Sequence, residues 1–353
     1  MQVDYLIIGQ GISGTFLSYY LEQEQKSFLV IDENDPNAPS RLAAGIINPI
    51  TGRRLVKAWM IDDLLPFVWN AYQQIGQQLT ISCISQKSII DFFPDPFMKE
   101  SFVKRMNEEA AYLHAYPEQN QFNTSFQYEF GCGEIRPAYT AHLEILLPAW
   151  RKHLVSNNAL LEERFELDAL ETTADGISYK GIKAEKIIFC DGAASGESPY
   201  FRLLPFAPNK GEALVLEIKD LPDQHIFKKG LMLVPMVEKD RFWLGSAYTW
   251  DFTDTLPTEA FRNNAERVLQ SWIKQPYNII SHLAGLRPAT LERRPFVGLH
   301  PTHPSVGILN GMGTKGCSLA PYFAKQFTDH LIYKMPITPE ADVKRFAKVL
   351  QRG

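Results

Sequence analysis

The sequence lacks the features that would place it in a membrane or outside the cell. No apolar run approaches the roughly 18 residues that a membrane-spanning helix needs, and the first residues, MQVDYLIIG, lack the pattern of a secretory signal. The four cysteines, Cys83, Cys132, Cys190 and Cys317, are widely spaced and form no CxxC pair. We therefore expect buried free thiols, no metal site and a cytoplasmic location.

The chain also lacks a strong excess of charge. Its net charge of −4 over 353 residues gives no general attraction for nucleic acid, which would need a local basic patch. Two basic clusters occur, one of Arg53, Arg54 and Lys57 and the other of Arg293 and Arg294. For both, a solvated surface and a contact with an anionic ligand remain open. The length predicts about two domains, each with its own core.

The stretch YLIIGQGISG, residues 5–14, packs three glycines behind an apolar run. Val3–Ile8 is typical of a short buried strand, and the residues after the glycines have helical spacing. Gly9 suits the tight turn, Gly11 a close approach to a pyrophosphate, and Gly14 the packing of helix on strand. A second apolar strand ends in Asp32, 32 − 9 = 23 residues after Gly9. This order predicts a dinucleotide site in which Asp32 binds a ribose, and Asp32 in place of Arg argues against a 2′-phosphate.

Further glycine-rich segments follow strand-like runs later in the chain. SRLAAGIINPITGRR, residues 40–54, is typical of a loop rather than a helix. The run KIIFCDGAAS, residues 186–195, ends in a glycine turn, and GILNGMGTKGCSLAP, residues 307–321, leads into an expected helix from about 319 to 333. Separate glycine sites at several strand ends predict one long, extended ligand.

These motifs together resemble the D-amino-acid oxidase superfamily of flavoproteins, which includes glycine oxidase and sarcosine oxidase. The resemblance rests on YLIIGQGISGTFLSYYL, AAGIINP, IIFCDGAAS, NKGEALVLEI, GLRPATLERRPFVG and NGMGTKGCSLAP, which occur in the family's order. It implies an α/β (α+β) fold with a discontinuous, Rossmann-like FAD-binding domain over 1–75, 135–210 and 283–353. A substrate domain built on a largely antiparallel sheet would comprise 76–134 and 211–282.

The resemblance also implies the residues that hold FAD. Phe165 takes the place near the adenine where the family usually has Val, and the segment 311–316 would meet the flavin N1–C2=O edge. There a helix start would stabilise negative charge. The expected cofactor residues are Gly9, Gly11, Ile12, Ser13, Gly14, Asp32, Glu33, Ser40, Arg41, Ala43, Ala44, Gly45, Ile46, Phe165, Asp191, Gly192, Ala193, Gly311, Met312, Gly313, Thr314, Lys315 and Gly316.

Three residues are the candidates for substrate contact. The resemblance implies that Arg287, in AGLRPAT, clamps a substrate carboxylate, which suits its planar, permanently charged fork. The other interpretation is that Arg287 ties down a turn at 285–288. Tyr248, with Trp250, is expected on a strand facing the flavin, either as an aromatic wall or as core packing. Asn48 is ambiguous between substrate contact and structure, and Lys210 is expected to be structural.

The implied reaction is oxidation of the C–N bond of an amino acid or N-substituted glycine, a small-molecule amine. The α C–H would pass a hydride to flavin N5, the imine would hydrolyse, and oxygen would reoxidise the flavin. A neutral amine needs no general base, which agrees with the lack of a convincing catalytic histidine. FAD is expected to be non-covalent, because the linking cysteine of sarcosine-oxidase-like relatives would lie near AGLRP and Cys317 falls well past it.

Alternatives to this reaction remain open. AAGIINP and GMGTKG also resemble the flavin half of bacterial tRNA wobble-uridine modification enzymes, which oxidise a carboxymethylaminomethyl group, so tRNA is an alternative substrate. A flavin-binding protein without turnover is another alternative. An NAD-dependent dehydrogenase would leave the later glycine sites unexplained.

Overall fold

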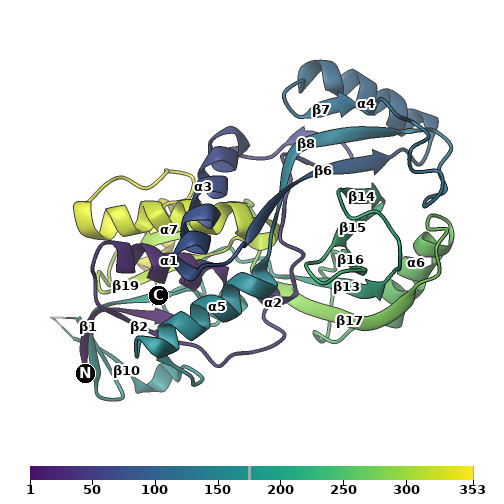
Figure 1. Cartoon of the computed structure of the whole chain (residues 1–353). Coiled ribbons are helices and arrows are strands. Elements are labelled where there is room, and N and C mark those ends of the chain that lie inside the picture. Colours follow the sequence, from purple (N-terminus) through teal and green to yellow (C-terminus); the bar gives the residue numbers. More distant parts are fainter. Residues whose placement is uncertain (174–175, 353) are drawn as a thin grey trace.

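The computed structural model describes residues 1–173 and 176–352 and contains two large sheets, which lie on opposite sides of the molecule (Figure 1). In the first sheet, the parallel strands β19, β12, β1 and β2 lie side by side in that order, with β1 and β12 in the centre. Its strands are β1 (Gln2–Ile8), β2 (Phe28–Ile31), β9 (Leu160–Leu161), β10 (Leu170–Thr173), β11 (Gly176–Tyr179), β12 (Ile182–Phe189), β18 (Phe296–Leu299) and β19 (Val306–Asn310).

The second sheet is largely antiparallel, as expected, with one parallel pair between β14 and β6. Its order is β17-β13-β16-β15-β14-β6-β8-β3, and β7 pairs with β8. The strands are β3 (Ile46–Ile47), β6 (Ile84–Phe92), β7 (Leu113–Ala115), β8 (Cys132–Ala141), β13 (Asn209–Glu217), β14 (Ile226–Lys229), β15 (Leu231–Pro235), β16 (Arg241–Gly245) and β17 (Asn278–Arg287). A separate hairpin joins β4 (Ile50–Thr51) to β5 (Val56–Lys57).

The helices cover the sheets because their apolar faces are buried against them. Helices α1 and α7 pack together on the first sheet, and α6 packs on the second through Phe261, Ala265 and Leu269. The α-helices are α1 (Ile12–Gln23), α2 (Pro39–Leu42), α3 (Ile61–Leu79), α4 (Pro96–Glu108), α5 (Leu143–Ser156), α6 (Glu259–Gln270), α7 (Gly316–Tyr333) and α8 (Ala347–Leu350). The 3₁₀-helices are η1 (Leu167–Ala169), η2 (Gly192–Gly196), η3 (Gly313–Lys315) and η4 (Val343–Phe346).

The fold corrects two expectations about local structure. The 40–54 segment is not all loop, because α2 begins at Pro39, whose fixed φ suits the first turn of a helix. The segment 285–288 is not a turn, since the long strand β17 continues to Arg287 in register with β13.

The strands of the first sheet all lie in segments that were predicted to form the FAD domain. The expected boundaries at 134/135 and 282/283 fall inside β8 and β17, and the division into domains stays a prediction.

Within the described residues, no helix is both long enough and apolar enough to cross a membrane.

Candidate functional site

A pocket of about 1570 Å³ runs along the carboxyl ends of the central strands of the first sheet and reaches the second sheet. It exceeds the roughly 300–1,000 Å³ typical of sites for drug-sized ligands. Strands β1, β12 and β19 are parallel neighbours, so the glycine segments that follow them meet at one edge. Open α/β sheets bind ligands at this edge. The topology therefore converts three distant sequence motifs into one elongated site.

The N-terminal glycines leave the start of α1 open to the pocket. Gly9 has φ +97°, and a Cβ there would lie 2.7 Å from the carbonyl oxygen of Cys190. A Cβ on Gly14 would lie 1.9 Å from the carbonyl oxygen of Gly9, which shows how closely α1 packs on the end of β1. Gly11 has no side chain with which to cap α1, and the first turn of the helix holds no acidic residue, although Ser40 Oγ accepts a hydrogen bond from the N–H of Ile12 (3.1 Å). Backbone N–H groups at such a start favour an anion.

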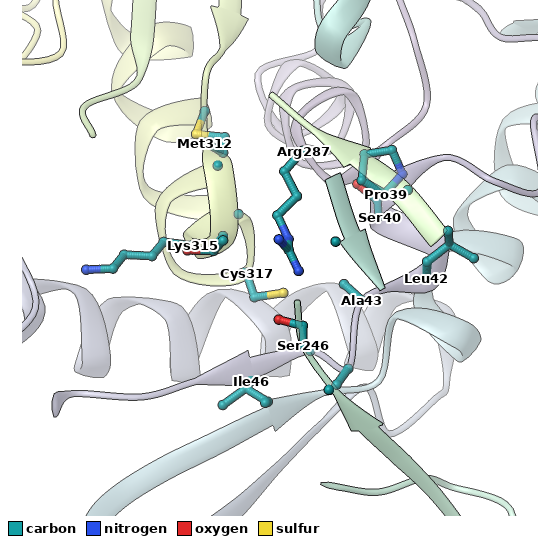
Figure 2. A pocket seen from close by; sticks show the side chains of 18 of the residues that line it. Pro39, Ser40, Leu42, Ala43, Ile46, Ser246, Arg287, Met312, Lys315 and Cys317 are labelled. Carbon is teal, nitrogen blue, oxygen red and sulfur yellow. The ribbon is translucent and has the colours of Figure 1, made fainter. Parts of the chain in front are cut away.

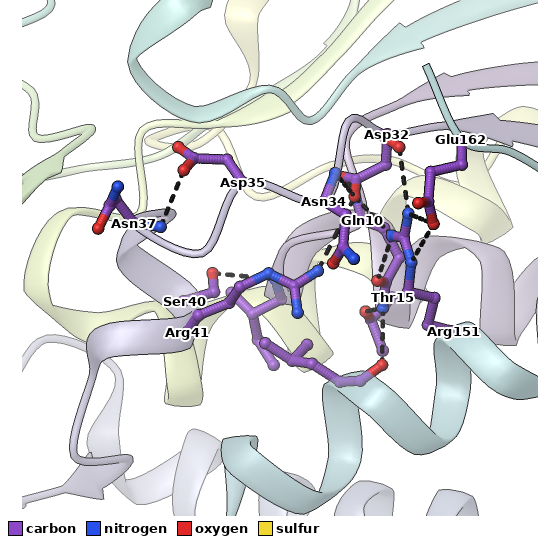
Figure 3. Close-up of polar contacts among 12 residues, drawn as sticks. Gln10, Thr15, Asp32, Asn34, Asp35, Asn37, Ser40, Arg41, Arg151 and Glu162 are labelled. Atoms are coloured by element: carbon purple, nitrogen blue, oxygen red, sulfur yellow. Dashed lines mark hydrogen bonds and ion pairs between the residues drawn. The ribbon is translucent and has the colours of Figure 1, made fainter. Parts of the chain in front are cut away.

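Asp32, at the end of β2, belongs to a network that the sequence analysis missed (Figure 3). Its Oδ2 accepts a hydrogen bond from the backbone N–H of Gln10 (2.8 Å), and its Oδ1 accepts from Arg151 Nη1 (2.6 Å). Arg151, on α5, is buried and also donates to Glu162 through Nη2 (2.7 Å). These donors hold the Asp32 carboxylate at the pocket wall. The backbone N–H of Asn34 also donates to Oδ1 (2.9 Å). Because a carboxylate offers about four acceptor positions, about one remains for a hydroxyl.

A second network joins the ends of β12 and β19. The side-chain amide of Asn310 donates to the carbonyl of Gly192 (2.8 Å), to Ser195 Oγ (2.9 Å) and to Asp191 Oδ1 (3.2 Å). Ser195 Oγ also donates to Asp191. Burial raises the pKa of Asp191 to about 6, although these hydrogen bonds lower it. Asn310 thus holds the glycine turn at 192 against the glycine segment that begins at 311.

Arg287 ends β17 and points into the pocket from the second sheet (Figure 2). Its Nη1 donates to Asn209 Oδ1 (2.8 Å) and to the carbonyl of Ala247 (3.0 Å), and its guanidinium lies 4.7 Å from the centre of the Tyr248 ring. The guanidinium occupies the space beside Gly211, where a Cβ would lie 2.0 Å from Nη2. Burial lowers the pKa of Arg287. A partly buried guanidinium with no carboxylate within 4 Å among the described residues favours an anionic ligand.

The other substrate candidates have different surroundings. Tyr248 lines the pocket but follows the end of β16 instead of lying on it, and it is 59% exposed, so the core-packing alternative is wrong. Trp250 is 57% exposed and does not line the pocket, because it lies in the same loop beyond the end of the strand. Asn48 lines the pocket, and its side-chain oxygen accepts from the N–H of Ile50 (3.0 Å). Lys210 is buried, and its Nζ lies 3.4 Å from Asp254 Oδ1, which agrees with a structural role.

The structure brings most of the predicted cofactor residues to the pocket, while their contacts with FAD stay predictions. Three of them do not line it. Gly14 faces Gly9, Gly311 faces Thr290, and Arg41 lies beside a smaller hollow with Nη2 3.9 Å from Asp32. The residues that do line it are Gly9, Gly11, Ile12, Ser13, Asp32, Glu33, Ser40, Ala43, Ala44, Gly45, Ile46, Phe165, Asp191, Gly192, Ala193, Met312, Gly313, Thr314, Lys315 and Gly316.

Sequence reasoning missed several pocket residues on the second sheet. Trp243 and Met232 line the pocket from β16 and β15, and Trp243 Nε1 donates to the carbonyl of Leu42 (3.0 Å). Ser246, just after β16, and Cys317, on α7, also line the pocket. Burial raises the pKa of Cys317 to about 12, so its thiol stays protonated and is a poor nucleophile. The apolar runs LMLVP and FWLG, residues 231–235 and 242–245, predict strands and were the signal available for Met232 and Trp243.

The residues present fit an extended dinucleotide such as FAD. The start of α1 could accept a pyrophosphate, the Asp32 carboxylate lies at the next strand end, and the glycine segments after β12 and β19 border the pocket as well. As expected, all four cysteines are buried and free. Within residues 1–173 and 176–352, no group of three or more His, Cys, Asp or Glu side chains could hold a metal ion.

Comparison with known proteins supports this interpretation. The family described as FAD dependent oxidoreductase (DAO) matches residues 4–330. A glycine oxidase of Pseudomonas putida is 23% identical over 97% of this chain and 98% of its own length. Among solved structures, the fold resembles an iminodiacetate oxidase from Chelativorans sp. BNC1 (TM-score 0.78, 16% identity, 96% of this chain and 98% of that one). It also resembles a glycine oxidase from Bacillus cereus (TM-score 0.78, 15% identity, 95% and 96%).

Proposed function

Because this chain belongs to the DAO family of FAD-dependent oxidoreductases, we propose that it oxidises the C–N bond of a small amino acid or N-substituted glycine. The chain is an FAD-dependent enzyme. The names of its relatives, glycine oxidase and iminodiacetate oxidase, support an amine that carries a carboxylate. The amine itself and the reoxidation by oxygen belong to the proposal.

The observation that carries the proposal is the position of Arg287. Its guanidinium reaches the pocket from the second sheet, while the glycine segments border it from the first. Asn209 and the carbonyl of Ala247 both accept from Nη1. Nη2 donates to no described protein acceptor and stays available for a carboxylate. A charged hydrogen bond of this kind is stronger than a neutral one and fixes the orientation of the substrate.

The residues of this chain then position the reacting bond. Arg287 holds the carboxylate, the Tyr248 ring covers the guanidinium, and Met312 and Trp243 supply apolar pocket surface. Bound FAD would supply a two-electron acceptor for the α-hydride, with dioxygen as the proposed final acceptor and hydrogen peroxide as its product. No histidine lines the described part of the pocket. This agrees with a reaction in which the amine enters neutral and needs no general base.

The test is anaerobic reduction of the enzyme-bound flavin by a panel of amines. We expect glycine, sarcosine, proline or a D-amino acid to bleach the flavin absorbance, and the corresponding amines without a carboxylate to bleach it far more slowly. Release of hydrogen peroxide in air tests the final acceptor. Bleaching by a modified tRNA but by no free amino acid would overturn the proposal, as would no bleaching by any amine.

Variants of Arg287 and its neighbour test the carboxylate site. Arg287→Ala removes the cation and should lower kcat/KM for carboxylate-bearing amines by about 10- to 150-fold, from the 1.5–3 kcal/mol of a charged hydrogen bond. Gly211→Ala keeps the cation but fills the space that its guanidinium occupies, so it should lower kcat/KM in the same direction. Gly196→Ala, at a glycine that does not line the pocket and whose Cβ would lie no closer than 3.8 Å to its nearest neighbour, is the control. An unchanged kcat/KM in Arg287→Ala would contradict the role.

A further inference from the structure

Arg287 is not the only positive side chain on the pocket. Arg53 and Lys315 line the pocket from the β4–β5 hairpin and from η3. Burial lowers the pKa of Lys315, and the positive charges of Arg294 and Arg293 lower it further. Figure 2 shows the Lys315 side chain pointing away from Arg287. We call Arg53, Arg293, Arg294 and Lys315 the cationic rim.

No carboxylate neutralises the cationic rim within the part of the chain that the structure describes. None of its four members lies within 4 Å of an Asp or Glu oxygen, whereas the neighbouring carboxylates are already paired. Asp62 pairs with Lys57 (2.7 Å), and Glu292 pairs with Arg345 (3.3 Å). Positive charges that no carboxylate neutralises repel one another. The repulsion is relieved when a negatively charged ligand lies between them.

Trp59 gives the rim a defined shape. The guanidinium of Arg294 lies 4.3 Å from the centre of the Trp59 ring, and Trp59 in turn stacks on Phe323 of α7 (5.8 Å between ring centres). A guanidinium that lies over an aromatic ring can still donate hydrogen bonds to an oxyanion. Trp59 also lines the pocket. The Arg294 side chain is therefore fixed at the pocket instead of moving freely in solvent.

We propose that the cationic rim binds a second anionic group of the substrate, a carboxylate or phosphate on the substituent that leads away from the reacting nitrogen. This rests on the proposed function, in which Arg287 binds the first carboxylate. The Lys315 side chain points away from Arg287, so one carboxylate does not satisfy both cationic positions. The rim then selects N-substituted glycines with an acidic tail over those with an apolar tail.

The first test compares N-substituted glycines of equal length that end in a methyl, a carboxylate or a phosphonate. We expect kcat/KM to be higher for both anionic ends than for the methyl end, and the larger of the two identifies the preferred anion. Arg53→Gln and Arg294→Gln should each reduce the ratio of anionic to methyl substrates by about fivefold. Arg294 bonds Thr290 only through its backbone, so the substitution leaves that turn intact.

The matched control is Lys57→Gln, which removes one positive charge from the same hairpin, a charge that Asp62 already neutralises. It should leave the substrate ratio unchanged. Equal kcat/KM for all three substrates in the wild type would overturn the proposal, as would a ratio that survives in both rim variants. The ratio should also fall as salt is added, because exposed charges are screened.

A binding measurement separates this proposal from the proposed function. Pyrophosphate titrated into the FAD-loaded protein in a calorimeter should bind, and Arg53→Gln and Arg294→Gln should weaken its binding while Lys57→Gln does not. If no amine reduces the flavin, the proposed oxidation fails and this titration still decides whether the rim is an anion site. If pyrophosphate binds equally to the wild type and both rim variants, the proposal that the cationic rim binds an anion is wrong, whichever substrate the enzyme oxidises.

Discussion

Asp191 is a carboxyl that the fold keeps from water at a predicted cofactor position. It lies at the end of β12, where the carboxyl accepts hydrogen bonds from Ser195 and Asn310. Burial is the larger effect and raises its pKa to about 6 from an ordinary 3.8. An acid with a raised pKa keeps its proton in the folded state at a pH at which the unfolded chain has lost it. This position therefore makes stability depend on pH.

The sign of that dependence gives a prediction for Asp191→Asn. Between about pH 4 and 6 the folded state binds the extra proton, so the wild type loses stability as the pH rises through this window and changes no further above it. The loss is at most roughly 3 kcal/mol. The variant has no proton to lose at this site. Urea unfolding at pH 4.5 and 7.5 should show the wild type weakening relative to Asp191→Asn, and a constant difference would contradict the raised pKa.

At the scale of elements, the contact between β1 and α1 decides the predicted pyrophosphate site. Gly14→Ala would improve the intrinsic helix propensity of α1 by about 1 kcal/mol. However, its Cβ would lie 1.9 Å from the carbonyl oxygen of Gly9, and backbone cannot move aside as a side chain can. Overpacking of this kind costs about 1–3 kcal/mol or more. We expect the variant to melt at a lower temperature and to retain less FAD on purification.

The control for this prediction lies in the same helix. Gln23→Ala also raises helix propensity, at the exposed end of α1 and far from Gly9. It should keep both its melting temperature and its FAD content. If Gly14→Ala behaved in the same way, close packing at Gly14 would not be what holds the helix start against the strand.

At the scale of the whole molecule, the pocket borders both sheets, so a bound cofactor joins them. Gly9, Asp191 and Met312 line it from the first sheet, and Gly211, Trp243 and Arg287 line it from the second. The Trp243 side chain, on β16 of the second sheet, also donates a hydrogen bond to the carbonyl of Leu42 on α2. A ligand that touches both sheets should stabilise them as a single unit.

Removal of FAD tests this coupling. A ligand at 100 times its dissociation constant stabilises the folded state by about 2.7 kcal/mol. We expect protein stripped of FAD to melt several degrees lower, with the second sheet losing amide protection together with the first in hydrogen exchange. Full recovery on adding FAD is the control. Protection lost from the first sheet alone would contradict a joint role for the cofactor.

The order of the motifs along the sequence was enough to predict the first sheet and a cofactor site at its edge. The N-terminal motif consists of a strand, the glycines at 9, 11 and 14, a helix and Asp32. These parts follow one another closely in the sequence, so their spacing predicts how they lie relative to one another. The later glycine segments lie at strand ends, and parallel strands place such ends at one edge. For this reason the motifs predicted a site for a long dinucleotide, and their resemblance to a flavoprotein family implied a Rossmann-like domain and FAD.

Only the tertiary structure decided how the site is built around those motifs. Arg151 reaches Asp32 across 119 positions of sequence, and the guanidinium of Arg287 fits beside Gly211 because β13 and β17 pair in one particular register. The sequence showed the basic clusters at 53–57 and 293–294 but left open whether they face solvent or a ligand. Spacing encodes contacts within a turn or a strand, whereas contacts between distant segments depend on how the sheets pack.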